Sequence, residues 1–89
     1  LSNISYHTVM QDKMPWFEVS ISDHGPGIPA NMENKLFEPY ASNKTKGTGL
    51  GLAIVQKIVE EHGGHVWAEN LASAGASIII RLPLEGATL

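Results

Sequence analysis

The feature that most constrains the fold is a glycine-rich stretch that leads directly into an amphipathic helix. Glycines alternate with other residues at Gly47, Gly49 and Gly51, and residues 52–62 then repeat with helical periodicity. Gly63 and Gly64 follow, as expected where a helix ends. The apolar side of this predicted helix carries Leu52, Ile54, Val55, Ile58 and Val59.

This stretch is suited to binding an anion. Glycine lets the backbone adopt conformations that other residues avoid, and it leaves amide N–H groups uncovered. The first turn of a helix adds free N–H groups and a partial positive charge. The combination favours a phosphate group, although the same glycines could simply form a flexible loop before a core helix.

Composition restricts the class of protein. The chain has 89 residues, so it forms one small domain or part of one. The net charge of −3 gives no electrostatic case for a nucleic-acid partner. The chain has no cysteine and hence no disulfide framework or thiolate metal site, and no apolar run approaches the roughly 20 residues of a membrane span.

The first part of the chain predicts a β-hairpin followed by a short helix. Residues 16–22 alternate between apolar and polar side chains, and residues 4–10 alternate weakly. Residues 11–15 are polar and include a proline, which predicts a turn between two antiparallel strands. Residues 30–37 are predicted to form a short helix.

The last part predicts a second hairpin. Strands are expected at residues 65–70 and 76–82, with a turn at residues 71–75 between them. Strands grouped as hairpins with helices between them favour a mixed or largely antiparallel sheet with helices on one face.

The loop after the second strand is a candidate binding site. Asp23 stands where a strand ends, and two glycines and two prolines follow it within residues 24–29. Its carboxylate could accept a hydrogen bond from an exocyclic amine, while Gly25 and Gly27 could let a flat ring lie close to the backbone. By itself the motif is equally typical of a plain Asp-x-Gly turn.

Residues 38–46 are polar and without periodicity, and we expect them to act as a flexible lid between the two glycine motifs. Lys44 and Lys46 are the only charged residues in this segment after Glu38. A lid over a polyphosphate would need such cations. We favour a phosphate contact for Lys44 and an ordinary surface position for Lys46.

Together these motifs resemble the catalytic and ATP-binding domain of sensor histidine kinases. Asp23-x-Gly25-x-Gly27 looks like the G1 box, residues 37–40 (Phe-Glu-Pro-Tyr) like the F box, and residues 47–52 like the G2 box. The F-box sequence and Lys44 are most similar to the nitrogen-regulation type of sensor kinase. The resemblance implies the Bergerat (GHKL) fold, an α/β two-layer sandwich with a mixed sheet and helices on one face.

The resemblance also implies the ligands and their contacts. ATP would bind with Mg²⁺, Asp23 would accept from the adenine amino group, and Phe37 would anchor the lid. The residues expected to bind ATP are Asp23, Gly25, Gly27, Ile28, Lys44, Gly47, Thr48, Gly49, Leu50, Gly51 and Leu52.

Two elements of the family pattern are not found in these 89 residues. One is the N-box helix, which supplies the principal Mg²⁺ ligand, and the other is the H box with its phosphoacceptor histidine. We therefore expect a parent kinase that transfers the γ-phosphate to a histidine in another segment, and a fragment that is inactive alone. Without the N-box helix, an apolar patch should be exposed, through which the fragment could self-associate. Its residues would be Phe17, Val19 and Ile21, or Ile78, Ile80 and Leu82.

The expected organisation and partners follow from the same resemblance. Residues 1–84 would be a partial ATP-binding domain and residues 85–89 a tail. The parent would work in two-component signal transduction with its own dimerisation and phosphoacceptor domain and a response regulator, without nucleic acid. It would act in the cytoplasm, either soluble or anchored to the membrane. The alternatives are a non-catalytic ATP-binding switch module and a degenerate GHKL-fold interaction domain.

Overall fold

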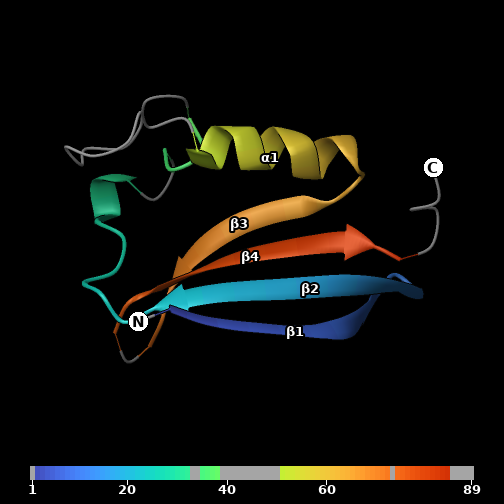
Figure 1. The fold of residues 1–89 in the computed structure, drawn as a ribbon, viewed down its shortest axis with the longest axis horizontal. Coiled ribbons are helices and arrows are strands. Elements are labelled where there is room, and N and C mark those ends of the chain that lie inside the picture. Colours follow the sequence, from blue (N-terminus) through green and yellow to red (C-terminus); the bar gives the residue numbers. More distant parts are fainter. Residues whose placement is uncertain (1, 33–34, 39–50, 73, 85–89) are drawn as a thin grey trace.

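The structure is a computed structural model that describes residues 2–32, 35–38, 51–72 and 74–84 (Figure 1). Within these residues, four strands form one sheet in the order β1-β2-β4-β3. One α-helix, α1 (Gly51–Glu61), lies beside the sheet on its β3 side. Every strand pairing described is antiparallel, which agrees with the predicted mixed or largely antiparallel sheet.

The first predicted hairpin is confirmed, with longer strands than expected. β1 (Ser2–Gln11) and β2 (Met14–Asp23) are joined by only two residues, Asp12 and Lys13. Both have positive φ, 53° and 64°, as in the type I′ turn whose twist matches that of the flanking strands. Because so short a turn suffices, the residues on either side of it stay paired across the strands instead of forming the predicted five-residue turn.

The second hairpin is also confirmed. β3 (His65–Asn70) has the predicted bounds, and β4 (Ala76–Pro83) extends one residue beyond them. β4 lies between β3 and β2, so the strands of the second hairpin continue the sheet begun by the first.

The helix α1 ends as the sequence predicts. Gly63 has φ of 79°, its N–H donates to Glu60 O (3.0 Å), and the N–H of Gly64 donates to Val59 O (2.9 Å). This pair of bonds is the Schellman motif, which needs a residue that accepts positive φ. The ring Nδ1 of His62 lies 2.8 Å from Ile58 O, so this histidine also caps the end of the helix.

Residues 30–37 do not form the single helix that the sequence predicted. The segment contains a three-residue 3₁₀ helix, η1 (Ala30–Met32), and a turn at residues 35–38. Its bonds span three residues, from Met32 N–H to Pro29 O and from Lys35 N–H to Met32 O. So short a segment gains too few hydrogen bonds to offset the cost of starting an α-helix.

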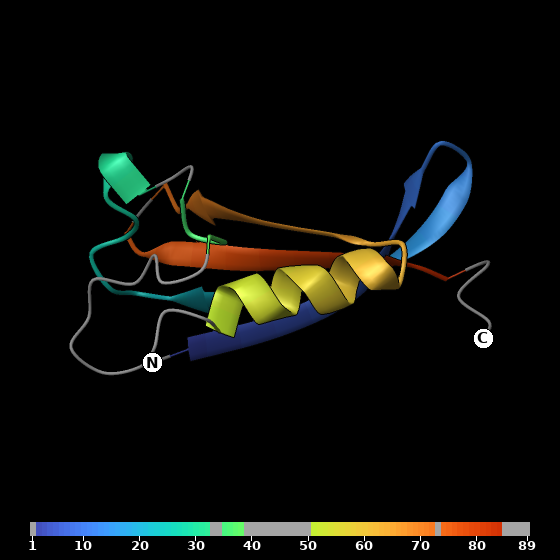
Figure 2. The ribbon, with the colours of Figure 1, turned by 90° about the horizontal axis from the view of Figure 1, so that it is seen from above.

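The face of the sheet that carries α1 is the one bearing Ile78, Ile80 and Leu82. A Cβ at Gly64 would lie 2.8 Å from Leu82 Cδ2 and 3.1 Å from Val59 Cγ1, so the helix and this face meet there. Figure 2 shows α1 to one side of the sheet in the perpendicular view. Val59, the buried residue of α1, packs at this contact.

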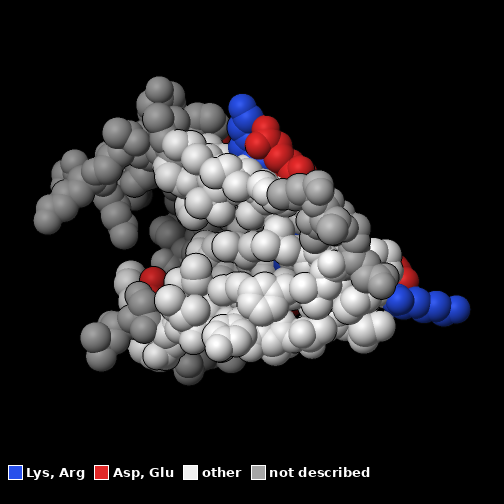
Figure 3. Space-filling view, turned by 45° about the vertical axis from the view of Figure 1, so that its right-hand side comes forward, with Lys and Arg blue, Asp and Glu red and all other residues white. Residues whose placement is uncertain are grey.

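This face remains partly open. Ile4 and Tyr6 on β1 are 68% and 71% exposed, and Ile54 and Ile58 on α1 are 53% and 50% exposed. Figure 3 shows a surface that is mostly uncharged in the middle, with charged side chains towards its margins. An apolar patch is therefore exposed as expected, but its most exposed residues lie on β1 and α1. Within the two predicted stretches, Ile21 is 37% exposed.

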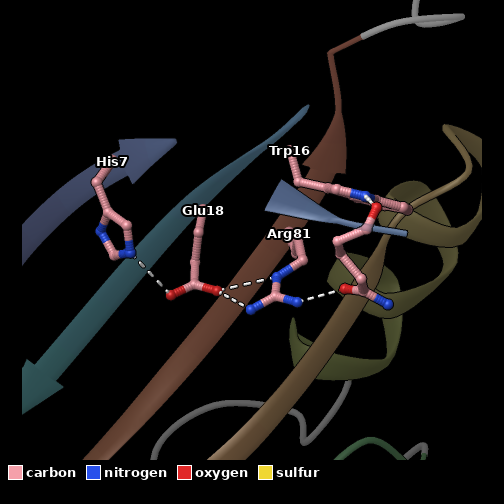
Figure 4. Close-up of polar contacts among 5 residues, drawn as sticks. His7, Trp16, Glu18 and Arg81 are labelled. Carbon is pink, nitrogen blue, oxygen red and sulfur yellow. Dashed lines mark hydrogen bonds and ion pairs between the residues drawn. The ribbon is translucent and has the colours of Figure 1, made fainter. Parts of the chain in front are cut away.

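The opposite face carries a polar network that crosses the strands (Figure 4). Arg81 Nε donates to Glu18 Oε1 (2.9 Å), its other nitrogens reach Glu18 and Gln11, and Glu18 Oε2 lies 3.3 Å from His7 Nε2. The Arg81 guanidinium also lies over the Trp67 ring, 5.3 Å from its centroid. The charged groups of this network are paired with one another, whereas the face that carries α1 leaves apolar side chains exposed.

Candidate functional site

The two binding motifs predicted from the sequence meet at one end of the molecule. Asp23 is the last residue of β2, and Gly51 is the first residue of α1. Figures 1 and 2 both show these two element ends at the same end of the sheet. Strand alternation places the Asp23 side chain on the same face as Ile21, the face that carries α1. A ligand at this end could therefore contact both motifs.

Asp23 is exposed, and its carboxylate is oriented by its own loop. Oδ1 accepts a hydrogen bond from the N–H of Gly25 at 3.0 Å. A side chain that accepts from the backbone two residues later forms an Asx turn, and it fixes the direction of the carboxylate. Asp23 can therefore stabilise an Asp-x-Gly turn and bind a ligand at the same time, because Oδ1 holds the turn while Oδ2 remains a second acceptor.

Two glycines let this loop lie against the turn between β3 and β4. Gly27 has φ of 91°, and a Cβ there would lie 2.8 Å from Asn70 Oδ1. Gly75 has φ of 94°, and a Cβ there would lie only 2.0 Å from Asp23 O. Since real Cβ atoms do not approach so closely, the loop and the turn fit together only with glycine at these positions.

Asn70 is a site residue that the sequence analysis missed. Its Oδ1 accepts from the N–H of Ile28 (2.7 Å), and its Nδ2 donates to Ile28 O (3.2 Å). The available signal was its place at the end of a strand, next to a turn, which is also what marked Asp23. The Asn70 side chain therefore bonds both the N–H and the carbonyl oxygen of Ile28, a residue that the sequence assigned to the binding site.

Further polar contacts fasten the strand ends beside this loop. His24 Nε2 lies 3.3 Å from Asn3 Nδ2 on β1. Ser22 Oγ donates to Ser77 Oγ at 3.2 Å, and Ser77 is buried. His24 is thereby tied to the neighbouring strand β1.

The phosphate end of the predicted site is described only where α1 begins. Gly51 is exposed, with open space around the position of a Cβ, and Leu52 is half-buried. The first turn of α1 contains no acidic residue, so no carboxylate there competes for its N–H groups. The remaining predicted contacts, Lys44, Gly47, Thr48, Gly49 and Leu50, lie outside the described residues.

The described residues contain neither a candidate metal site nor a candidate membrane-spanning helix. No group of three or more His, Asp or Glu side chains among them could hold a metal ion. None of the helices in these segments has the length and apolar character needed to cross a membrane.

The sequence of nearly the whole chain matches one protein family. The family described as "Histidine kinase-, DNA gyrase B-, and HSP90-like ATPase" matches residues 3–86. This match spans the strands, the loop that follows Asp23 and the helix α1, so it covers all the elements that form the candidate site.

Individual relatives agree with this family. The chain is 48% identical over 69 residues to the sensor histidine kinase ZraS of Klebsiella oxytoca, covering 78% of the chain and 15% of ZraS. It is 51% identical over 67 residues to the nitrogen regulation protein NtrY of Azorhizobium caulinodans, covering 75% of the chain and 9% of NtrY. The resemblance to nitrogen-regulation-type kinases is thereby confirmed, and the chain spans only a small part of either relative.

A solved structure supports the fold. Full-length ShkA, solved in complex with AMPPNP, matches with a TM-score of 0.70 and 28% identity, over 93% of this chain and 17% of ShkA. The predicted Bergerat fold is confirmed by this similarity together with the family match. The chain belongs to the histidine kinase-, DNA gyrase B- and HSP90-like ATPase family, and its relative ZraS is a sensor histidine kinase.

Proposed function

We propose that this chain is the ATP-binding part of a two-component sensor histidine kinase whose catalytic domain transfers the γ-phosphoryl group of ATP to a histidine. The observation that carries the proposal is the oriented Asp23 carboxylate, on the same face and at the same end as the start of α1. The family description names ATPases, and a structure with the ATP analogue AMPPNP exists for ShkA. Both support ATP as the ligand.

The proposed adenine contact follows from the loop geometry. With Oδ1 held by the N–H of Gly25, Asp23 can offer Oδ2 to the exocyclic amine of adenine. Guanine carries a carbonyl oxygen where adenine carries this amine, so two acceptors would oppose each other. Gly25, Gly27 and Ile28 form the backbone beside the base in this proposal.

The triphosphate is assigned to the other motif. Gly51 and Leu52 begin α1, whose N-terminal N–H groups suit an anion, and the proposal adds Lys44, Gly47, Thr48, Gly49 and Leu50. Magnesium would neutralise part of the phosphate charge during transfer. We assign its protein ligand and the phosphoacceptor histidine to other segments of a longer parent, and we propose that this chain alone has no kinase activity.

The base-reading role of Asp23 can be tested with two variants in the protein that contains this chain. Asp23→Ala removes the acceptor and should weaken ATP binding by about 10- to 100-fold, the worth of a hydrogen bond to a charged group. Binding of GTP should change little. Asp23→Asn keeps an oxygen for the N–H of Gly25 but places an NH2 donor where Oδ2 stood, opposite the adenine amine, so ATP binding should weaken at least as much as in Asp23→Ala while GTP binding holds or improves.

Calorimetric titration with both nucleotides measures these affinities. Equal losses for ATP and GTP in Asp23→Ala would contradict the adenine contact. If the parent binds ATP but phosphorylates no histidine, the kinase assignment fails and the switch module takes its place.

The remaining parts of the proposal concern organisation and partners. We propose residues 1–84 as a partial domain with a short tail, acting in the cytoplasm with a phosphoacceptor domain and a response regulator, and without nucleic acid.

We also propose that the isolated chain self-associates through its exposed apolar residues, among them Ile4, Tyr6 and Ile54. Light scattering at high micromolar concentration should show dimers or larger species, and a monomer there would contradict this.

A further inference from the structure

The turn between β3 and β4 contacts the Asp23–Ile28 loop at two separate points. Asn70 holds the far end of the loop through Ile28, and Gly75 lies against the backbone of Asp23 at its near end. The turn itself is closed by a bond from Leu71 N–H to Gly75 O at 3.0 Å. The loop is therefore attached to this turn at both ends.

The N–H and the carbonyl oxygen of Ile28 both bond the same partner, the side chain of Asn70. Asn70 Oδ1 takes the N–H and Asn70 Nδ2 takes the carbonyl oxygen. An amide side chain carries a donor and an acceptor side by side, so it can bond both groups at once. The position of Gly27, with positive φ and no room for a Cβ beside Asn70 Oδ1, lets the two groups meet.

This arrangement has a consequence for base recognition. While Asn70 is in place, the N–H of Ile28 is bonded to Asn70 and the N–H of Gly25 is bonded to Asp23, so neither can donate to a base. Asp23 Oδ2 remains as an acceptor, which suits the amine of adenine. A loop released from Asn70 would offer the N–H of Ile28 as an extra donor, and the O6 of guanine could accept from it.

We infer that Asn70 is a positioning residue that fixes the Asp23–Ile28 loop in the form that selects adenine over guanine. This inference rests on the proposed function, because it requires that the loop bind a purine nucleotide. Asn70 itself touches no part of the nucleotide in this proposal and acts only through Ile28.

The first measurement needs no nucleotide. Asn70→Ala should speed amide hydrogen exchange at Ile28, whose N–H is held by Asn70 Oδ1, while exchange within β4 stays unchanged. Glu69→Ala is the matched control, since Glu69 is exposed and strand alternation places it on the opposite face. The control should leave Ile28 exchange as it is in the natural protein.

The second measurement compares nucleotides. Asn70→Ala should weaken ATP binding by about five- to tenfold, as expected for losing two exposed hydrogen bonds, while GTP binding holds or improves. Binding of inorganic tripolyphosphate should not change. Asn70→Asp keeps an acceptor for the N–H of Ile28 but sets a second oxygen against Ile28 O, so it should restore the protection of this N–H more than it restores ATP affinity.

The outcomes separate this inference from the function on which it rests. If Asn70→Ala leaves Ile28 exchange unchanged, or weakens ATP and GTP equally, Asn70 does not position the loop for selection. If Asn70→Ala speeds Ile28 exchange but leaves the ATP affinity unchanged, the contact is structural only and the inference fails. If the natural protein binds no adenine nucleotide while Ile28 stays protected, the proposed function fails and takes this inference with it.

Discussion

The two ends of the sheet are held together by different kinds of contact. At the end that bears the candidate site, Ile28 is bonded to Asn70, which lies 42 residues away in the chain. At the other end, the Asp12–Lys13 turn and the Gly63–Gly64 helix end are closed by contacts within a few residues. The loop at the site end therefore depends on the assembled sheet, whereas the hydrogen bonds that close the turn and the helix end at the far end are local.

This difference has a consequence for stability. A local turn can form while the rest of the chain is unfolded, but the Asp23–Ile28 loop can reach its observed form only when β2 and β3 both flank β4. Substitutions at the site end should therefore disturb stability and ligand binding together. Those at the far end should disturb stability alone.

The largest effect is expected for Gly75→Ala. A Cβ at Gly75 would lie 2.0 Å from Asp23 O, and the residue has positive φ. Conformational strain and crowding together should lower the free energy of unfolding by about 3 kcal/mol, measured by urea denaturation. Because Asp23 must move, ATP binding should weaken as well.

The control for Gly75→Ala is Gly63→Ala at the far end. Gly63 also has positive φ, but the nearest atom to its Cβ position is Pro83 Cγ at 3.7 Å. Strain alone should cost about 1 kcal/mol there, without any effect on nucleotide affinity. Equal losses at the two glycines would show that the close approach to Asp23 contributes nothing.

A smaller effect is expected for Gly64→Ala, where crowding acts without positive φ. A Cβ at Gly64 would lie 2.4 Å from Arg81 O and 2.8 Å from Leu82 Cδ2. The backbone oxygen cannot move easily, so we expect a loss of about 2 kcal/mol in the free energy of unfolding. ATP affinity, measured under conditions where the variant is folded, should be unchanged. A selective loss of ATP over GTP would contradict the separation of the two ends.

The parts of the fold that could be predicted from the sequence are those with a local signal. Alternation of side chains identified both hairpins, and the glycine pair after residue 62 identified the end of α1. The α-helix predicted at residues 30–37 was wrong, because helix-forming residues alone do not reveal how few hydrogen bonds a short segment can make. The prediction made β1 and β2 too short, because a turn of two non-glycine residues with positive φ is rare and was not expected.

The candidate site could be predicted only where the motif itself is continuous. Asp23 and the start of α1 each carry a local pattern, and the structure brings both to one end of the sheet. Asn70 and Gly75 were not predicted, because their partners lie far away in the sequence and only the register of β3 with β4 places them beside the loop. A sequence position beside a turn does not show which loop it will contact.

The smallest expected effect is a gain in stability at the far end. Lys13 has φ of 64° in the two-residue turn, where glycine is favoured at the second position. Lys13→Gly should raise the free energy of unfolding by about 0.5–1 kcal/mol, because relief of the left-handed strain exceeds the added entropy of the unfolded chain.

Lys57→Gly provides the matched control for this gain, with the same loss of charge on the exposed side of α1. It should lower the free energy of unfolding by about 1 kcal/mol, since glycine is unfavourable inside a helix. Opposite signs for the same substitution would show that the turn geometry, and not the charge, decides the result. If Lys13→Gly instead lowered the free energy of unfolding, the lysine side chain would stabilise the hairpin by more than its backbone strain destabilises it. The local backbone conformation of the turn would then not by itself explain the stability of this hairpin.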